Sequence, residues 1–329
     1  MKKAVFLLVI LEGCILDNNL FEEKLACLPE ISAIRIMGDG NTIRLSGNYL
    51  LVTEGFEGLS VIDVSDPASM KETAYLKFPD LHTRALAIDT LNHVAYIGAK
   101  YYIISVNFES SPYLTILDTF DLQIMSDSAN VHYLAYKEPH LFAIINIHNN
   151  KSVIAMFNVE DPGNITLLDT VLLENRTYGT IQPYDNSNYL LVGFGSEIIL
   201  FKVVGIALLR VKSLVIRGSE RRMKLVGDSL LFIASSRGGL QIWRVIDSTD
   251  FVQITRIDNL AYFVDVSENL LFSADENVQV YDISSINDPV YIRYAKCGYY
   301  GIWDMVVGDD LLYLGCRDSI RVFQIRGGF

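Results

Sequence analysis

Residues 58–67 read GLSVIDVSDP, and residues 278–289 repeat this phrase as VQVYDISSINDP. In both copies, a short run of alternating apolar and polar residues leads into an acidic turn that proline closes. Alternation with a period of two indicates a half-buried β-strand, and Asp, Ser and Pro are residues that tight turns favour. Because the phrase recurs more than 200 residues further along the chain, it indicates a protein assembled from copies of one unit.

The rest of the chain carries this unit at a regular spacing. Seven short apolar segments, rich in β-branched and aromatic residues, lie at 49–52, 94–97, 141–144, 190–192, 230–233, 270–272 and 311–314. After each one, an alternating strand ends at a landmark position: Asp63, Asn107, Asn158, Lys202, Arg244, Asp282 and Gln324. The steps between successive landmarks range from 38 to 51 residues.

Repetition every 40–45 residues or so, with about four short strands per unit, is the signature of a β-propeller. The sequence therefore predicts an all-β, seven-bladed propeller with four-stranded antiparallel blades. We expect the inner strands, such as 42–46, 84–88 and 222–226, to line the axis, and 71–78 to form an outer strand.

The last unit lacks an outer strand, because the chain ends soon after residue 325. The segment at 31–38 precedes the first complete unit and has strand character. We expect this N-terminal strand to complete the last blade, which closes the ring and removes two exposed sheet edges. Residues 31–329 then form a single domain.

The composition narrows the classes of partner. Half of the 329 residues are hydrophobic, 20% are charged, and the net charge is −12. A large core can be buried, whereas an acidic surface does not suit nucleic acid or anionic lipid headgroups. We expect no nucleic-acid partner and a monomeric protein.

The first fourteen residues, MKKAVFLLVILEGC, have the layout of an export signal, with a basic start and a short apolar run. Eight apolar residues rise about 12 Å as a helix, too little for a hydrocarbon core of about 30 Å. The Leu11-x-Gly13-Cys14 ending resembles a bacterial lipoprotein lipobox, which implies lipidation of Cys14, with residues 15–30 as a tether. Glu12 stands where the lipobox usually has a small or apolar residue. The alternative is a buried strand in an intracellular protein with an ordinary Cys14.

The remaining cysteines leave two alternatives. Export permits disulfides, and Cys297 and Cys316 lie in neighbouring units, so they could form a bond or remain buried thiols. No C-x-x-C pair or zinc spacing occurs in the sequence, so we expect no thiolate metal site.

The acidic phrase also carries a family resemblance. Residues 58–76, GLSVIDVSDPASMKETAYL, resemble the LVIVD repeat, and 278–290, 155–168 and 104–117 are further copies. The segment 239–251 keeps the start of the repeat but lacks its proline. Proteins with such repeats are similar to exported or cell-surface β-propellers of bacteria and archaea, mostly without an assigned activity. The resemblance implies a binding role toward a protein or a surface glycan.

The acidic turns are poor candidates for a metal site. Calcium takes six to eight oxygens, whereas turns such as the one containing Asp63, Ser65 and Asp66 offer at most three side-chain ligands. Walker, G-x-G-x-x-G, H-E-x-x-H and G-x-S-x-G motifs do not occur. We expect neither a metal nor a cofactor.

The candidate site is the mouth of the central channel, where the loops that lead into the inner strands converge. These loops and strand starts carry Arg84, His132, Tyr178, Arg222, Tyr262 and Trp303, together with Asn41, His82, Arg221 and Tyr300. Arginine and aromatic side chains are typical anchors of interfaces. The alternative is that some of these side chains plug the channel or pair with Asp265 and Asp304 across the axis.

Three functions agree with these observations. The first is a non-enzymatic binding module of the cell envelope, for a protein or polysaccharide, attached to the membrane only through Cys14. The second is a propeller hydrolase or lyase that uses an axial His/Asp/Arg set. The third is a cytoplasmic scaffold analogous to WD-repeat proteins, which requires the N-terminal signal to be false. An enzyme should show titratable groups with perturbed pKa values converging on an open pocket.

Overall fold

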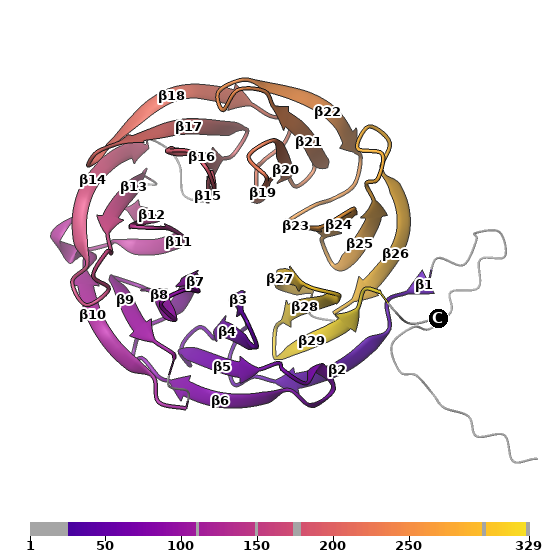
Figure 1. Cartoon of the computed structure of the whole chain (residues 1–329). Coiled ribbons are helices and arrows are strands. Elements are labelled where there is room, and N and C mark those ends of the chain that lie inside the picture. The colour runs from indigo at the N-terminus through magenta and orange to yellow at the C-terminus, as the bar shows by residue number, and fades with distance from the viewer. Residues whose placement is uncertain (1–25, 110–111, 149–150, 174–178, 298–300, 327–329) are drawn as a thin grey trace, which may run out of the picture.

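The computed structural model describes residues 26–109, 112–148, 151–173, 179–297 and 301–326 (Figure 1). Within these ranges the strands form seven sheets arranged in a ring around a central axis. The helical segments of the described residues are two short 3₁₀ turns, η1 (Pro67–Ser69) and η2 (Leu122–Ile124). The predicted seven-bladed, all-β propeller is confirmed.

The first strand of each blade lines the axis. These inner strands are β3 (Thr42–Ser46), β7 (Thr83–Asp89), β11 (Asn130–Lys137), β15 (Thr180–Pro183), β19 (Arg222–Val226), β23 (Phe263–Ser267) and β27 (Ile302–Gly308). Each inner strand contacts the inner strand of the next blade, and β27 of the last blade contacts β3 of the first. The ring is therefore continuous.

The two middle strands of each blade are the most buried. The second strands are β4 (Tyr49–Thr53), β8 (Val94–Ala99), β12 (His140–Ile147), β16 (Tyr189–Phe194), β20 (Leu230–Ala234), β24 (Leu270–Ala274) and β28 (Leu311–Cys316). The third strands are β5 (Leu59–Asp63), β9 (Tyr102–Asn107), β13 (Lys151–Asn158), β17 (Glu197–Val204), β21 (Leu240–Val245), β25 (Asn277–Asp282) and β29 (Ser319–Gln324). The second strands read as nearly continuous apolar runs because neighbouring blades cover both of their faces.

The outer strands twist away from the blades. They are β6 (Lys71–Leu76), β10 (Thr115–Asp121), β14 (Thr166–Leu173), β18 (Ala207–Val215), β22 (Phe251–Ile257), β26 (Val290–Lys296) and, in the last blade, β2 (Glu30–Arg35). In all seven blades the pairing of the third and outer strands contains a register shift. A β-bulge at this place increases the local twist, which the sequence did not predict.

The N-terminal strand closes the ring as predicted. β2 pairs antiparallel with β29 and completes the last blade. A further strand, β1 (Ala26–Cys27), pairs parallel with β26 as a fifth strand, and Leu28 is buried behind it. The described end of the expected tether is therefore attached to the sixth blade (Figure 1). No helix in the described part of the chain is both long and apolar enough to cross a membrane.

The core consists of seven clusters, and each cluster lies at one junction between neighbouring blades. At the junction of the first two blades, for example, Leu51 and Val61 pack with Leu86 and Ile97. A single blade cannot bury both of its apolar faces, so stacking of the blades stabilises the fold.

The acidic turns are closed by their own side chains. The Oδ1 atom of Asp63 accepts a hydrogen bond from the Ser65 N–H at 2.9 Å, and Oδ1 of Asp66 accepts one from Ala68 N–H at 3.1 Å. Asp282 does the same for Ser284 N–H at 2.8 Å. The residues that looked like metal ligands therefore act as Asx turns.

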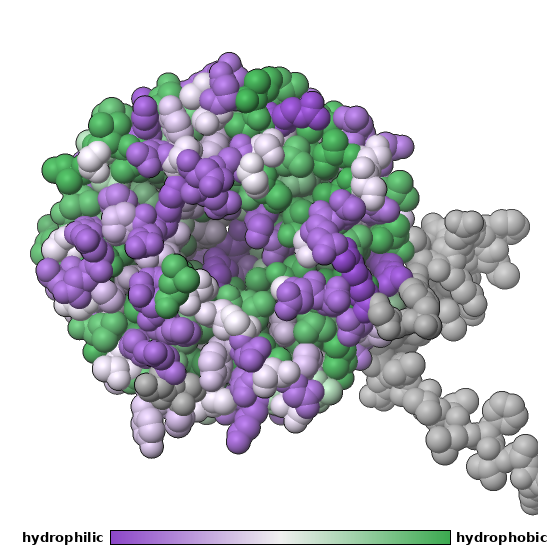
Figure 2. Space-filling view, in the orientation of Figure 1, coloured by the Kyte–Doolittle hydropathy of each residue, from purple (hydrophilic) through white to green (hydrophobic). Residues whose placement is uncertain are grey.

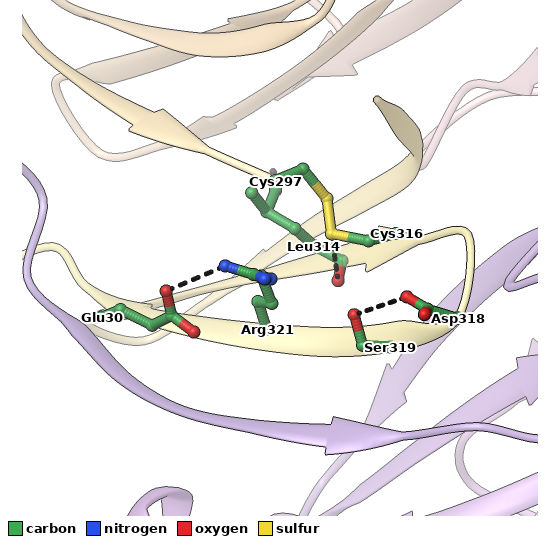
Figure 3. The surroundings of a disulfide bond; sticks show 7 residues. All are labelled: Glu30, Cys297, Leu314, Cys316, Asp318, Ser319 and Arg321. Carbon is green, nitrogen blue, oxygen red and sulfur yellow. Dashed lines mark hydrogen bonds and ion pairs between the residues drawn. A yellow bond between two sulfur atoms is a disulfide. The ribbon is translucent and has the colours of Figure 1, made fainter. Parts of the chain in front are cut away.

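A disulfide joins the last two blades. Cys297, which follows β26, is bonded to Cys316 at the end of β28 (Figure 3). Nearby, Arg321 of β29 forms an ion pair with Glu30 of β2, 3.2 Å between nitrogen and oxygen. Of the two alternatives that the sequence left open, the structure contains the bond.

Candidate functional site

A cavity of about 660 Å³ opens at one end of the axis, where the inner strands begin. All seven blades contribute to its wall, through residues that include Asn41, Arg84, His132, Thr180, Arg222, Tyr262 and Trp303. A second cavity of about 420 Å³ adjoins it and adds Asp39 and His82. Figure 2 shows the hollow at the centre of the ring, with hydrophilic surface inside it.

The structure brings most of the predicted site residues together. Arg84, His132, Arg222, Tyr262 and Trp303 all line the larger cavity. Tyr178 and Tyr300 lie outside the described residues, as does the predicted lipidation site Cys14.

Three of the lining residues share one backbone feature. In β7 the register shifts between Thr83 and Ala85, so Arg84 is the extra residue of a β-bulge. His132 is placed in the same way in β11, and Trp303 in β27. Such bulges re-aim a side chain out of the regular alternation of a strand. The inner strands of the other four blades pair without a shift.

Arg222 has a structural partner. Its guanidinium lies 2.6 Å from Oδ1 of Asp304, whose other oxygen is 3.0 Å from Arg44. Asp304 is only 2% exposed, and Arg222 lies over the rings of Tyr133 and Phe263. The sequence left open that arginines at the mouth pair with Asp304 across the axis. Arg222 forms this pair, so its role is structural.

The second foreseen carboxylate is also paired. Lys224 lies 2.8 Å from Oδ1 of Asp265, and Oδ2 of Asp265 accepts a hydrogen bond from Val307 N–H at 3.0 Å. These bonds link the inner strands of the fifth, sixth and seventh blades. Ion pairs thus connect inner strands across and around the axis.

Arg84 differs from these cations. Its side chain is exposed, and no ion pair involves it among the described residues. Its backbone is held firmly, because the Arg84 carbonyl accepts hydrogen bonds from the hydroxyls of Thr42 and Thr53, at 2.6 and 3.3 Å. The mouth therefore presents a guanidinium on a rigid support.

The neighbouring histidines are neutral at physiological pH. Burial, together with the positive charges of Arg84 and Arg222, lowers the pKa of His132 to about 3. Burial and the charge of Arg84 also lower the pKa of His82. In both histidines burial is the main cause and the positive charge of Arg84 adds to it, while Asp39 partly offsets the effect at His82.

Glu220 is a cavity residue that sequence reasoning missed. It is 4% exposed, and its Oε1 atom accepts a hydrogen bond from the Thr180 hydroxyl at 2.5 Å. Its Oε2 atom has no hydrogen-bond partner and packs against Gly193, where a Cβ would lie 2.6 Å away. Burial raises the pKa of Glu220 to about 7. The sequence did contain a signal for Glu220. When IMGDGNTIRL at 36–45 is aligned with IRGSERRMKL at 216–225, Glu220 occupies the position of Gly40.

Exposed apolar side chains occur on the cavity wall, at Trp303, and next to cavity residues, at Phe56 beside His82 and at Met37 two residues before Asp39. Trp303 is 39% exposed, Phe56 is 64% exposed and Met37 is 65% exposed. The Phe56 ring packs edge-on against His82, with 4.8 Å between centroids, and Arg221 lies over the Tyr262 ring. This combination of exposed aromatic, Met and Arg side chains is typical of protein interfaces.

The cavity is better arranged for binding than for catalysis. His132 and Glu220 do have perturbed pKa values, as an enzyme would require. His132, however, is too weak a base near neutral pH, and both Glu220 oxygens are turned away from solvent toward Thr180 and Gly193. In the described ranges, no group of three or more His, Cys, Asp or Glu side chains is placed to hold a metal ion.

These features define a seven-bladed β-propeller with an axial cavity. A sequence profile described as the LVIVD repeat matches residues 37–75, which contain the four strands of the first blade. The chain thus carries an LVIVD repeat, a repeat family found in β-propeller proteins, as the resemblance predicted. A search of curated protein sequences finds no match.

Solved structures share the fold at low sequence identity. A chain of the mitotic checkpoint complex is similar with a TM-score of 0.73 and 11% identity, covering 99% of this chain and 100% of that one. The WD40 β-propeller domain of Doa1 has a TM-score of 0.69 and 12% identity, covering 90% and 97%. U3-55K has a TM-score of 0.66 and 11% identity, covering 89% and 98%.

Proposed function

We propose that this protein is a non-catalytic binding module that engages a partner protein through its axial mouth. The observation that carries the proposal is the exposed Trp303 on the cavity wall beside the unpaired cation of Arg84, with the exposed Phe56 packed against His82 of the same cavity. Apolar side chains of this size lose contact with water when a partner covers them, and Arg and aromatic side chains are frequent hot spots.

A protein partner accounts for this surface better than a glycan does. Met37 and Phe56 are flexible or fully apolar, whereas the wall of a sugar site mainly needs polar groups and a flat aromatic ring. The similar fold of a chain in the mitotic checkpoint complex supports the proposal, because it shows that such a propeller can serve in a multi-protein assembly. The fold alone does not define a partner.

We further propose that the protein works in an oxidising compartment outside the cytoplasm. The described cysteines, Cys27, Cys297 and Cys316, are all disulfide-bonded, which supports export. The lipid anchor on Cys14 stays a prediction from the sequence. The mass of the native N-terminal peptide tests this prediction.

Site-specific photo-crosslinking tests the binding proposal. A benzoylphenylalanine at position 303 should form an adduct with one partner protein in intact cells of the source organism. The matched control carries the same group at Leu91, which is 80% exposed and lies in the turn between β7 and β8, at the opposite end of the blade. A partner captured equally from both positions, or only from position 91, would exclude the mouth.

A double variant provides an independent check. Arg84→Ala with Trp303→Ala should abolish co-purification of the partner that the crosslink identifies while leaving the fold intact, because both side chains are exposed. Arg222 does not belong in this variant, since its loss would leave Asp304 and Arg44 without their shared ion pair. Undiminished recovery would contradict the proposal.

A further inference from the structure

The cations of the axial end differ in how their charge is balanced. Arg44 and Arg222 share Asp304, and Lys224 pairs with Asp265. These three cations belong to bonds between inner strands. Arg84 has no such carboxylate among the described residues, although the protein carries a net charge of −12. Arg221 also lacks an ion pair among the described residues, but it lies over the Tyr262 ring at the start of the fifth blade, three blades away from Arg84. Arg84 is therefore the unpaired cation of its own side of the cavity, and such a cation on an acidic protein is a local positive site for a ligand.

The nearby carboxylates do not cancel this charge. Asp39 lines the smaller cavity with Arg84 but lies 3.6 Å from Arg317, which draws it toward the last blade. Asp275 and Glu276 line the opposite wall, in the turn between β24 and β25 of the sixth blade, three blades away from β7. The cavity therefore has a positive side at Arg84 and a negative side across the axis.

The β-bulges indicate that the positive side is built for a ligand. Each bulge residue stands outside the regular alternation of its inner strand, and the three of them are Arg84, His132 and Trp303. They come from the second, third and seventh blades, so the fold gathers a guanidinium, an imidazole and an indole on one arc of the wall. Inner strands without a bulge, β3 and β19, contribute the paired cations Arg44, Arg222 and Lys224.

Resting on the proposed function, we propose that Arg84 binds the carboxylate of an acidic side chain of the partner protein, with Trp303 packed against the adjoining chain. Arginine presents a planar fork that matches both oxygens of a carboxylate. On this arc of the wall, Arg84 is the one cation among the described residues, and the neighbouring His82 and His132 are neutral, so the arc balances one negative charge. A phosphate dianion would require a second cation on the same arc, so a carboxylate is the better match.

Intrinsic fluorescence offers a direct test, because the chain has only two tryptophans. Trp303 lies on the cavity wall, and Trp243 is 8% exposed in the core between the fourth and fifth blades. The probes are an acetylated and amidated hexaglutamate peptide and the matching hexalysine and hexa-phosphoserine peptides. The Trp303→Phe variant should lose the signal and thereby assign it to the mouth.

Three variants measure the role of Arg84. Arg84→Gln should weaken hexaglutamate binding about tenfold or more, because it removes a charge-assisted contact worth roughly 1.5–3 kcal/mol. Arg84→Lys keeps the charge but not the fork, so its affinity should lie between wild type and Arg84→Gln. The control Arg244→Gln makes the same charge change on an exposed residue of β21 and should match wild type.

Each outcome bears on the inference. Selective binding of hexaglutamate that depends on Arg84 supports it. Equal binding of hexalysine, tighter binding of hexa-phosphoserine, or an Arg84→Gln variant that binds like wild type would overturn it. If the Trp303 crosslink to the partner persists in Arg84→Gln, the binding role at the mouth stands and the carboxylate assignment falls. If position 303 yields no partner at all, the proposed function itself fails.

Discussion

Carboxylates occur at the turns of the blades and at the axial end, and their hydrogen bonding and pKa values differ between these two regions. In the turn after β5, Asp63 is satisfied by the backbone of Ser65 two residues away, and hydrogen bonds from Ser65 lower its pKa. At the axis, Glu220 is buried with one oxygen unpartnered, and burial raises its pKa to about 7. The same chemical group is therefore a local turn element in one place and a destabilised buried acid in the other.

Asp304 shows a third outcome at the axis. It is buried like Glu220, yet both of its oxygens are bonded, to Arg222 and Arg44 and to backbone N–H groups. Burial alone therefore does not set the state of a carboxylate. The protonation state of a buried carboxylate depends on the bonding partners that other blades supply. Substitutions at Asp63, Glu220 and Asp304 should therefore separate the effect of burial from the effect of partners.

The largest effect is expected from Asp304→Ala. The variant leaves Arg44 and Arg222 without their shared counter-charge, and removal of one partner from a buried ion pair costs about 3–5 kcal/mol. Chemical denaturation measures the loss. Asp265→Ala is the matched control and should cost less, because Lys224 is 41% exposed and can turn to water. Equal losses in the two variants would show that exposure of the cation is irrelevant.

The second effect concerns Glu220 and pH. The folded state keeps the Glu220 proton up to about pH 7, whereas the unfolded chain releases it near the ordinary pKa of 4.5. The contribution of Glu220 is therefore fully present below about pH 4.5 and is lost as the pH rises to about 7, a change of about 3 kcal/mol. Glu220→Gln should remove this pH dependence.

The measurement is the difference in unfolding free energy between wild type and Glu220→Gln across this pH range. His132, whose lowered pKa makes stability rise with pH, and Glu54, whose burial raises its pKa, are present in both proteins. Their contributions therefore cancel in the difference. Parallel stability curves would mean that Glu220 titrates as an ordinary acid.

The smallest effect is expected at the turn. Asp63→Ala removes the acceptor of the Ser65 N–H and should cost about 1 kcal/mol. Asp63→Asn should be almost neutral, because the amide oxygen can accept the same bond, as Asn107 and Asn158 do in the next two blades. Thermal unfolding of both variants checks this. A large loss in the asparagine variant would point to a role for the charge itself.

The regular features of this fold could be predicted because they are local. Period-two alternation, the apolar second strands and the Asp-Val-Ser-Asp-Pro turn at 63–67 each depend on neighbours a few residues apart. Counting these units predicted seven blades, and the unpaired segment at 31–38 predicted the closure that β2 provides. The convergence of Arg84, His132 and Trp303 on one cavity then followed from the start positions of the inner strands.

The exceptions to that regularity required the assembled ring. The bulges at Arg84, His132 and Trp303 each depend on how an inner strand pairs with its neighbour, and one inserted residue leaves no clear mark in an alternating pattern. The outer bulges and the short strand β1 escaped prediction for the same reason.

The repeat unit, its number and its order are written in the chain, because turn chemistry and strand periodicity act over short distances. Contacts between blades decide which charged side chains at the axis are paired and which remain available to bind a partner. Arg222 meets Asp304 across 82 residues of sequence, and Glu220 meets Thr180 across 40. These contacts form only when the ring closes, and they leave the exposed guanidinium of Arg84 on the cavity wall without a carboxylate partner among the described residues.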